Sequence, residues 1–186
     1  MTIGIDLDCI SDDYLSKTSN PGLQPGLADR QYNRALAQNT TKMAYVKNWL
    51  HCVWGTKSKI PFLKDGIKKA ILDHIKENAK IKGIYIDAID GHTQHLHCLI
   101  SLHPDHSLSN VIRLLKGESS FWINKNHITK NKFSWAVEYY AVSVSESHVS
   151  RVRSYIKNQE EHHRKKTWDE EVEEYIRKYG FERFPG

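Results

Sequence analysis

The spacing of hydrophobic and polar residues predicts four strands in the chain. Residues 44–55, AYVKNWLHCVWG, are rich in β-branched and aromatic side chains and end at a glycine, as strands commonly do. Residues 83–91 and 92–102 form two further candidate strands, and the DGH sequence where they meet predicts a hairpin. Residues 133–145, FSWAVEYYAVSVS, predict the fourth strand. Alternation in the second strand is expected to place Ile84, Ile86 and Ala88 on one face and Tyr85, Asp87 and Ile89 on the other.

Hydrophobic residues recur at helical spacing in two segments between these strands. The segment 65–83 is expected to be a helix that ends before Gly83. Its expected apolar positions are Ile67, Ala70, Ile71, His74 and Ile75. The segment 105–126 is expected to be an amphipathic helix, with Ser107 or Ser109 as its N-cap. Its expected core stripe consists of Val111, Leu114, Leu115 and Phe121.

The sequence after the fourth strand is strongly helical. Ser145 or Ser147 is expected to cap a first helix. A second helix is expected to begin near Thr167, where Glu170 three residues later completes a capping box, and to end at Gly180.

The order β-α-β-β-α-β followed by helices is that of the split βαβ, ferredoxin-like pattern. We therefore expect an α+β fold in which an antiparallel four-stranded sheet has helices on one face and an open second face. The expected parts are a weakly ordered, polar extension at 1–42, a domain at 43–181 with a C-terminal helical region from about residue 146, and a tail at 182–186.

Composition narrows the classes of function. A chain of 186 residues that is 39% hydrophobic and 26% charged suits one soluble domain, and no apolar run reaches the roughly 20 residues of a membrane span. The acidic N-terminus does not resemble a signal peptide, and three scattered cysteines indicate a reducing cytoplasm rather than a disulfide framework. A net charge of +5 favours an anionic partner, with nucleic acid first, although a basic composition also occurs without such a role.

One predicted strand, HTQHLHCLISL, carries candidate metal ligands. His95 and His97 are two residues apart and therefore share a face. The residues expected to point the other way, toward the helices, are Leu96, Cys98 and Ile100. Two neutral imidazoles this close can share one metal ion. The alternatives are a polar outer face with two ordinary histidines, and a structural zinc site using Cys52 or Cys98, which the lack of a Cys-x-x-Cys sequence disfavours.

The segment SYIKNQEEHHRKK, residues 154–166, places Tyr155 and Gln159 four residues apart, on one face of a helix. A tyrosine hydroxyl is a poor nucleophile at its ordinary pKa of about 10, but it can attack a phosphodiester when a metal ion polarises the phosphoryl oxygen. Gln159 could supply an oxygen ligand to the same ion, and the phosphotyrosine product would keep the energy of the phosphodiester bond. The alternative is a core tyrosine beside a surface glutamine.

Five stretches resemble, in the same order, the small single-tyrosine HUH transposases of insertion sequences, including relatives associated with repetitive extragenic palindromes. They are YVKNWLHCVWGTKSKIPFL, the HLH at 95–97, LLKGESSFWI, WAVEYYAVSVSES and YIKNQEEHHRKKTWDEEVEEYIRKYG. The resemblance covers residues 43–181. Two features differ from the family pattern: residues 1–42 precede it, and Gln94 stands where an acidic residue or asparagine is common in the relatives.

The resemblance implies that Tyr155 is the catalytic nucleophile and that His95, His97 and Gln159 hold a divalent ion, Mg²⁺ or Mn²⁺. It implies DNA transposition, in which single-stranded DNA is cut and rejoined near hairpins through a 5′-phosphotyrosine. It also implies a homodimer, with action of the tyrosine helix on the partner's histidines left open beside action within one chain, in a bacterial or archaeal cytoplasm close to the nucleoid. Imidazole ligands suit manganese better than magnesium, which prefers oxygen.

Basic and aromatic residues are candidates for contacts with DNA. The candidates for phosphate contacts are Lys57, Lys59, Arg113, Lys116, Arg151, Arg153, Arg164, Lys165 and Lys166. The candidates for stacking on bases are Trp54, Trp122, Trp135, Tyr139 and Tyr140, of which the first and third also fit strand interiors. Two other functions remain open: a related HUH relaxase or replication-type nickase, and a non-catalytic nucleic-acid-binding or structural-zinc protein of the same fold.

Overall fold

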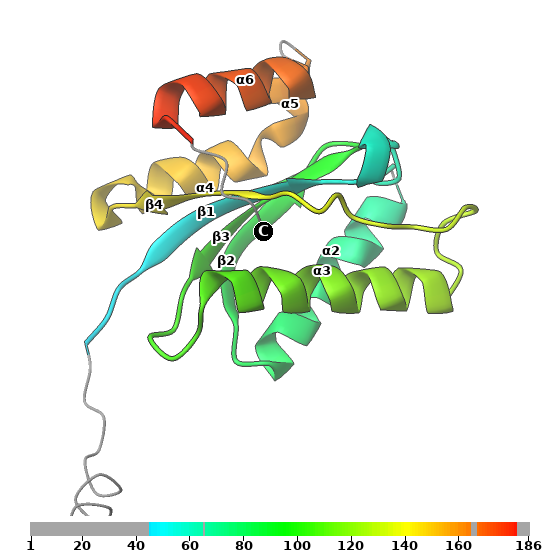
Figure 1. Cartoon of the computed structure of the whole chain (residues 1–186), viewed down its shortest axis with the longest axis horizontal. Helices are drawn as coiled ribbons and strands as arrows, with labels where there is room; N and C mark the ends of the chain where they lie inside the picture. Colours follow the sequence, from blue (N-terminus) through cyan, green and yellow to red (C-terminus); the bar gives the residue numbers. More distant parts are fainter. Residues whose placement is uncertain (1–44, 65, 165–166, 182–186) are drawn as a thin grey trace, which may run out of the picture. The chain divides into compact units, whose positions relative to one another are not determined.

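The computed structural model describes residues 45–64, 66–164 and 167–181, and it contains a four-stranded antiparallel sheet with the order β2-β3-β1-β4 (Figure 1). The strands are β1 (Trp49–Gly55), β2 (Tyr85–Gly91), β3 (His95–Ser101) and β4 (Tyr140–Val144). β3 lies between β1 and β2, and β1 lies between β3 and β4, so each βαβ unit is split by a strand of the other. The expected α+β, ferredoxin-like fold is confirmed. The predicted extension at 1–42 and tail at 182–186 lie outside the described residues.

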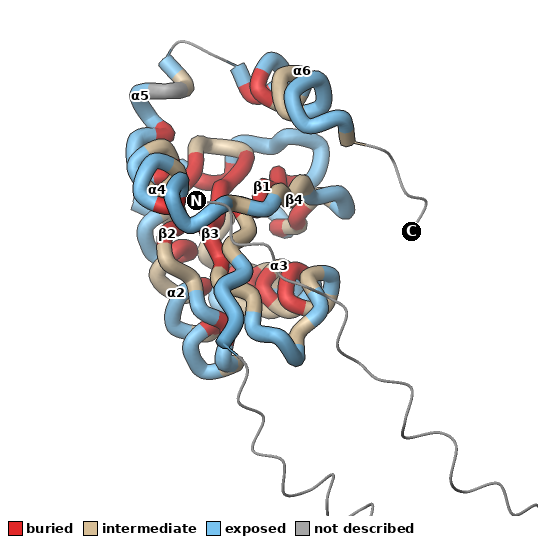
Figure 2. The backbone as a smooth tube through the Cα atoms, turned by 90° about the vertical axis from the view of Figure 1, so that its left-hand side faces the viewer, coloured by how far each residue is buried: buried red, intermediate tan, exposed pale blue. Residues whose placement is uncertain are grey.

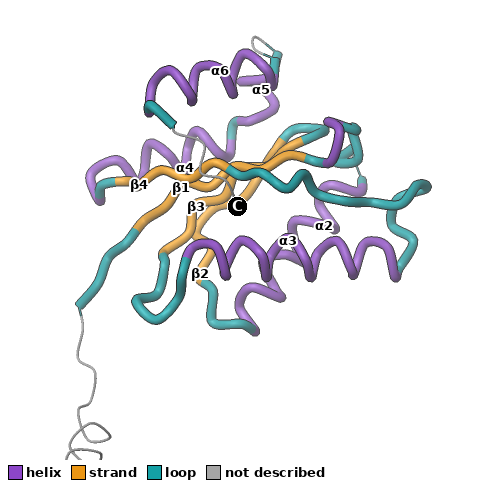
Figure 3. Tube along the Cα trace, viewed as in Figure 1, coloured by secondary structure: helices purple, strands orange, loops and turns teal. Residues whose placement is uncertain are grey.

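Helices lie on both faces of this sheet (Figures 1 and 3). The helices are α2 (Ile67–Ile81), α3 (Leu108–Lys125), α4 (Val149–Lys157), α5 (Gln159–His163) and α6 (Trp168–Tyr179), with short 3-10 turns η2 (Lys57–Lys59) and η3 (Glu146–His148). α2 and α3 pack on one face, as expected, but the C-terminal helices lie over the face that was expected to be open. That expectation was wrong because α4 and α6 present their own apolar residues to the second face. None of the described helices has the length and apolar character of a membrane span.

The main core lies between the sheet and helices α2 and α3. Leu96, Cys98 and Ile100 of β3 are fully buried in it, so the predicted orientation of these side chains is confirmed. Trp54 and Trp135 meet edge to face in the same core, with ring centroids 6.1 Å apart. The buried segments in Figure 2 follow the strands and the inner sides of the helices.

A smaller core fixes α4 to the opposite face of the sheet. It consists of Ala88, Leu99, Val149 and Ile156. The prediction that Ala88 shares a face with Ile86 was wrong, because the pairing of β2 with β3 shifts between these residues and reverses the alternation. The Asp87 carboxylate at this irregularity accepts hydrogen bonds from Arg153 of α4 at 2.7 and 3.0 Å, which adds a polar anchor for the helix.

The fourth strand is shorter than the predicted 133–145. Trp135 forms only an isolated bridge with Thr56, and continuous pairing begins at Tyr140. The Lys116 ammonium explains the gap, because it donates to the carbonyl oxygens of Val137 at 2.8 Å and Glu138 at 3.3 Å. These carbonyls bind a side chain in place of a neighbouring strand.

The predicted stripes of the two central helices are correct at most positions. Ala70 and Phe121 are exposed, contrary to expectation. The buried stripe of α3 passes through Leu115, Ser119 and Ile123 in steps of four, and Phe121 falls between these steps and faces solvent.

Helix ends agree with the predicted caps except at α4. The Ser107 side chain accepts from the amide of Asn110, and Thr167 and Glu170 form the expected capping box. Gly180 ends α6 in the left-handed conformation. Neither candidate serine caps α4, which begins after η3 without a side-chain cap.

Candidate functional site

The two histidines of the HLH sequence lie side by side on the face of β3 that the C-terminal helices cover. The side chains of His95 and His97 are both 0% exposed. On the neighbouring strand, the Nε2 atom of His51 lies 3.1 Å from Nδ1 of His97, so one ring nitrogen of His97 is fixed and Nε2 turns toward the site. His51 was not among the predicted site residues, although alternation along β1 separates it from the core residue Cys52 and assigns it to the histidine face.

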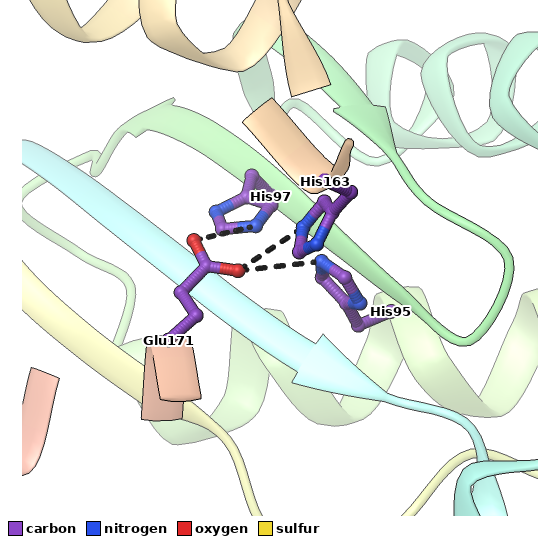
Figure 4. Close-up of side chains that lie close together, drawn as sticks. All are labelled: His95, His97, His163 and Glu171. Carbon is purple, nitrogen blue, oxygen red and sulfur yellow. Dashed lines mark ion pairs between the residues drawn. The ribbon is translucent and has the colours of Figure 1, made fainter. Parts of the chain in front are cut away.

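His163 of α5 and Glu171 of α6 complete a cluster around the two strand histidines. One ligand atom from each of the four residues lies within 4.8 Å of all the others. Figure 4 shows the Glu171 carboxylate pointing at the three imidazoles. Its Oε2 atom lies 3.1 Å from His163 Nε2 and 3.6 Å from His95 Nε2, and its Oε1 atom lies 3.5 Å from His97 Nε2. Neither His163 nor Glu171 was among the site residues predicted from the sequence.

One face of α6 packs directly on this cluster. Trp168 stacks on the His95 ring, with centroids 4.0 Å apart and an interplanar angle of 11°. Glu171 and Tyr175 follow at the three- and seven-residue spacings that place side chains on the same side of a helix. This spacing of an aromatic, an acidic and an aromatic residue is the sequence signal that could have identified the buried carboxylate.

Tyr155 reaches the cluster from α4. Its hydroxyl donates a hydrogen bond to Oε1 of Glu171, and its ring meets His97 edge to face with centroids 5.6 Å apart. Tyr175 donates to the Tyr155 hydroxyl at 3.4 Å. Burial raises the pKa of Tyr155, as do the charge of Glu171 and the hydrogen bond to it. The phenol is therefore neutral at physiological pH and requires a proton acceptor to become a nucleophile.

Glu171 can provide that acceptor because it is ionised in this environment. Burial by itself would raise the pKa of Glu171, but hydrogen bonds from His163 and Tyr155 and the charge of His95 outweigh burial and lower the pKa below its ordinary value.

Gln159 lies where the tyrosine helix breaks. α4 ends at Lys157, Asn158 adopts a turn, and Gln159 begins α5. The predicted one-turn spacing survives this break, because Gln159 Nε2 still donates to the backbone oxygen of Tyr155 at 3.4 Å. Gln159 is 0% exposed, and its Oε1 atom has no hydrogen-bond partner among the described residues. A buried amide oxygen that accepts no hydrogen bond from the described residues can serve as a metal ligand.

The donors around Glu171 fit a divalent ion. Imidazole nitrogen and carboxylate oxygen are the ligand types that zinc and manganese accept at about 2.0–2.2 Å. The cluster is compact enough for one ion to reach all four groups after small shifts of the side chains. Cys52 and Cys98 are not part of it, because both are buried in the main core on the other face.

A cavity of about 630 Å³ lies beside Tyr155 and Glu171, between β4, α4 and α6. Arg151 and Lys178 contribute cationic side chains to its lining, and Tyr175 contributes an aromatic ring. The volume is within the range of about 300–1,000 Å³ that is usual for ligand pockets.

The predicted phosphate contacts are distributed over both sides of the sheet. Lys57 and Lys59 lie in η2, Arg113 and Lys116 on α3, Arg151 and Arg153 on α4, and Arg164 directly after α5. Three of these cations already form ion pairs within the protein: Lys59 binds Asp169, Arg153 binds Asp87 and Arg164 binds Glu161. Lys165 and Lys166 lie outside the described residues. Among the seven described candidates, Arg151 is the one that lines the cavity beside Tyr155.

The predicted base-stacking residues are mostly occupied by packing within the protein. Trp54 and Trp135 are buried, and Trp122 stacks on His74 with centroids 4.0 Å apart. Tyr140 meets Trp168 edge to face, whereas Tyr139 is 36% exposed.

Comparisons with known proteins agree with this arrangement. The model of the family "Transposase IS200 like" matches residues 44–159. A Deinococcus radiodurans R1 protein assigned as a transposase is 23% identical with a TM-score of 0.51, over 65% of this chain and 97% of its own. The REP-associated tyrosine transposase bound to a REP hairpin is 15% identical with a TM-score of 0.50, over 67% and 74%. No curated protein sequence matches. At these identities the two structures support the fold, and the family model, which matches well over half of the chain, shows that this chain belongs to the IS200-like transposase family.

Proposed function

We propose that this transposase is metal-dependent and cuts and rejoins single-stranded DNA at hairpin-associated sites through a 5′-phosphotyrosine on Tyr155. The observation that carries the proposal is the hydrogen bond from the Tyr155 hydroxyl to Glu171, whose carboxylate also contacts His95 and His97. A nucleophile, a proton acceptor and a set of metal ligands thus meet at one point. The relative that was solved with a REP hairpin supports a DNA hairpin as the substrate.

Each residue of the site has a distinct role in the proposed reaction. The Tyr155 oxygen forms a bond to phosphorus while its proton passes to Oε1 of Glu171. The bond from phosphorus to the 3′ oxygen of the preceding nucleotide breaks, and that oxygen leaves as a 3′-hydroxyl with a proton from water. A divalent ion held by His95, His97 and Gln159 would supply Lewis-acid polarisation of the phosphoryl oxygen. Rejoining is the reverse reaction with a different 3′-hydroxyl, so no nucleotide cofactor is consumed.

The cavity beside Tyr155 suits the nucleotides on either side of the reacting phosphate. Arg151 and Lys178 can neutralise phosphate charge at its wall. Tyr175 and Tyr179 also line the cavity and stack on each other, with centroids 5.8 Å apart, which offers an aromatic surface to unpaired bases.

The oligomeric state is a separate part of the proposal. We expect a homodimer from the family resemblance. In this structure Tyr155 and His97 of the same chain are in contact, so a single protomer carries both the nucleophile and the histidines. Sedimentation at several protein concentrations, with and without hairpin DNA, measures the assembly directly.

A cleavage assay with DNA labelled at either end tests the proposal. In the presence of Mn²⁺, a 3′-labelled, hairpin-bearing oligonucleotide should become covalently attached to the protein, whereas a 5′-labelled one should yield a free fragment ending in a 3′-hydroxyl. Tyr155→Phe should yield neither product, while Tyr45→Phe, at a tyrosine that is 95% exposed and outside the site, should behave as the parent. Attachment of the 5′-labelled fragment, or cleavage that survives in Tyr155→Phe, would overturn the proposed chemistry.

A second candidate function is a non-catalytic nucleic-acid-binding protein stabilised by a structural metal. The observation in its favour is that the side chains of the four clustered residues are at most 3% exposed, as in closed structural sites. Tight ion binding without any strand cleavage would select this alternative.

A further inference from the structure

We propose that His163 and Glu171 are ligands of the divalent ion together with His95 and His97. Binding of the ion then stabilises the docking of α6 on the sheet. The inference rests on the proposed function, because it concerns the ion of the same site. It adds His163 and Oε2 of Glu171 to the proposed ligands from β3 and the start of α5, and it leaves Oε1 of Glu171 to accept the proton of Tyr155. It also predicts the class of ion, a transition metal such as Mn²⁺, Co²⁺ or Zn²⁺ in preference to Mg²⁺.

The positions of the donor atoms are the first argument. Glu171 Oε2 lies 3.1 Å from His163 Nε2 and 3.6 Å from His95 Nε2. Two ligands bound at about 2.1 Å to one ion are separated by roughly 3.0–4.2 Å, depending on the angle between them. The separations between the carboxylate oxygens and the three imidazoles therefore match those of a coordination sphere, and Figure 4 shows all three rings turned toward the carboxylate.

The packing behind each imidazole is the second argument. Trp168 covers the face of His95, and His92 stacks on His163 with centroids 4.8 Å apart. His51 fixes the remaining nitrogen of His97. Metal-binding histidines characteristically have a partner that sets their orientation, and His97 has one in His51. His163 is supported like the strand histidines, although it comes from a different element.

The placement of Glu171 is the third argument. A carboxylate that is 2% exposed is costly unless it is paired. The capping box at Thr167 fixes the start of α6, so Trp168 and Glu171 project from its first turn onto the histidines. An ion bound there would join β3, α5 and α6, whereas a site made by Gln159 and the strand histidines would leave α6 unattached to the metal.

The donor set decides the class of ion. Three imidazoles and one carboxylate are ligands that zinc, cobalt and manganese accept readily. Magnesium prefers oxygen ligands and retains several waters, which a cluster with side chains at most 3% exposed does not favour.

Calorimetric titration with Co²⁺ and Mn²⁺ on the full-length protein, without DNA, tests the inference through binding alone. Glu171→Gln and His163→Ala should each weaken Co²⁺ binding by more than the roughly 10–100-fold that is typical of outer-shell substitutions. In the parent, Co²⁺ should increase the protection of α6 amides from hydrogen exchange, and this increase should disappear in Glu171→Gln.

Matched controls separate loss of a ligand from a general disturbance. Glu173→Gln removes an exposed carboxylate from the same helix, and His103→Ala removes an exposed imidazole from a distant loop. Both should bind Co²⁺ as the parent does. Glu171→Gln keeps the size of the side chain, and circular dichroism establishes that each variant is folded.

The outcomes distinguish this inference from the proposed function. If His95→Ala and His97→Ala abolish binding while His163→Ala and Glu171→Gln bind Co²⁺ like the parent, the inference is wrong and the site proposed with Gln159 stands. If the parent binds no transition-metal ion, the inference also fails, and the labelled-DNA assay then decides separately whether Tyr155 chemistry occurs. Weaker binding in both variants, with unchanged controls, supports the inference.

Discussion

The Tyr155 hydroxyl on α4 donates a hydrogen bond to the Glu171 carboxylate on α6, although 15 residues separate the two in the sequence. The same carboxylate contacts the histidines of β3 through both of its oxygens. One acidic residue therefore connects the candidate nucleophile with the candidate metal ligands. The reactivity of Tyr155 should depend on this residue more than on any other acid of α6.

Replacement of Glu171 by glutamine tests this dependence. Glu171→Gln keeps the size of the side chain but removes the proton acceptor, so formation of the covalent DNA adduct should slow by roughly 10²–10⁴-fold. Single-turnover cleavage of a hairpin oligonucleotide at saturating Mn²⁺ measures this rate. Glu173→Gln, on the exposed side of α6, should react at the parental rate. Equal rates for the two variants would show that the carboxylate takes no part in the reaction.

Two glycine substitutions with opposite expected signs test the packing beside β3 and the helical backbone of α3. A Cβ atom at Gly91 would overlap the carbonyl oxygen of His95 and the backbone of Leu96, so Gly91→Ala should destabilise the protein by about 1–3 kcal/mol. Gly117 lies inside α3 with no atom near its Cβ position, and Gly117→Ala should stabilise by about 0.5–1 kcal/mol. Urea unfolding measures both changes, and a loss of stability in Gly117→Ala would contradict the described helix.

Local patterns in the sequence predicted the parts of the fold that short-range physics decides. Alternation placed Leu96 and Cys98 under the helices and His97 on the opposite face, because period two is intrinsic to a strand. The capping box at Thr167 and Glu170 was also predicted, since its four residues form their own hydrogen bonds.

The features that were missed depend on contacts between distant segments. Ala88 lies on the face opposite to the predicted one, because the pairing of β2 with β3 is irregular between Ile86 and Ala88 and β2 alone does not show this. Glu171 is one of five acids in the stretch DEEVEE, and although it shares a helix face with Trp168 and Tyr175, only docking of α6 shows that this face is the covered one. His51 became part of the site because β1 lies beside β3 in the sheet. Spacing along the sequence gives the face on which His51 or Glu171 lies, but it does not show which distant segment that face meets.

Stability in the absence of metal should depend on pH through His51. Burial lowers the pKa of His51 from 6.5 to about 4, against the opposing effect of the Glu171 charge. Between these values the unfolded state binds more protons than the folded state, so stability falls as the pH is lowered from 6.5 toward 4. From pH 7 to pH 5 the loss due to His51 should be about 2 kcal/mol. Urea unfolding in EDTA at both pH values should show a smaller loss for His51→Gln, and an equal loss would contradict the prediction.

DNA binding should depend on salt through the cations at the cavity. The logarithm of the association constant should fall linearly with the logarithm of salt concentration. Arg151→Ala should reduce the slope by about 0.7, the value for one phosphate contact on a single strand. Lys80→Ala removes an exposed charge from α2, on the other face of the sheet, and should leave the slope unchanged. A parental slope in Arg151→Ala would exclude a phosphate contact at this residue.

The central claim is that Tyr155 is the residue that becomes linked to DNA, and peptide mapping of the adduct tests it most directly. The parent protein would be incubated with Mn²⁺ and a hairpin oligonucleotide, digested with protease and nuclease, and analysed by mass spectrometry. Tyr175, whose hydroxyl lies 3.4 Å from that of Tyr155, is the internal control, and Tyr175→Phe should still form the adduct. The account predicts a 5′-nucleotide on the peptide that contains Tyr155. A nucleotide on Tyr175, or on any other residue, would contradict it.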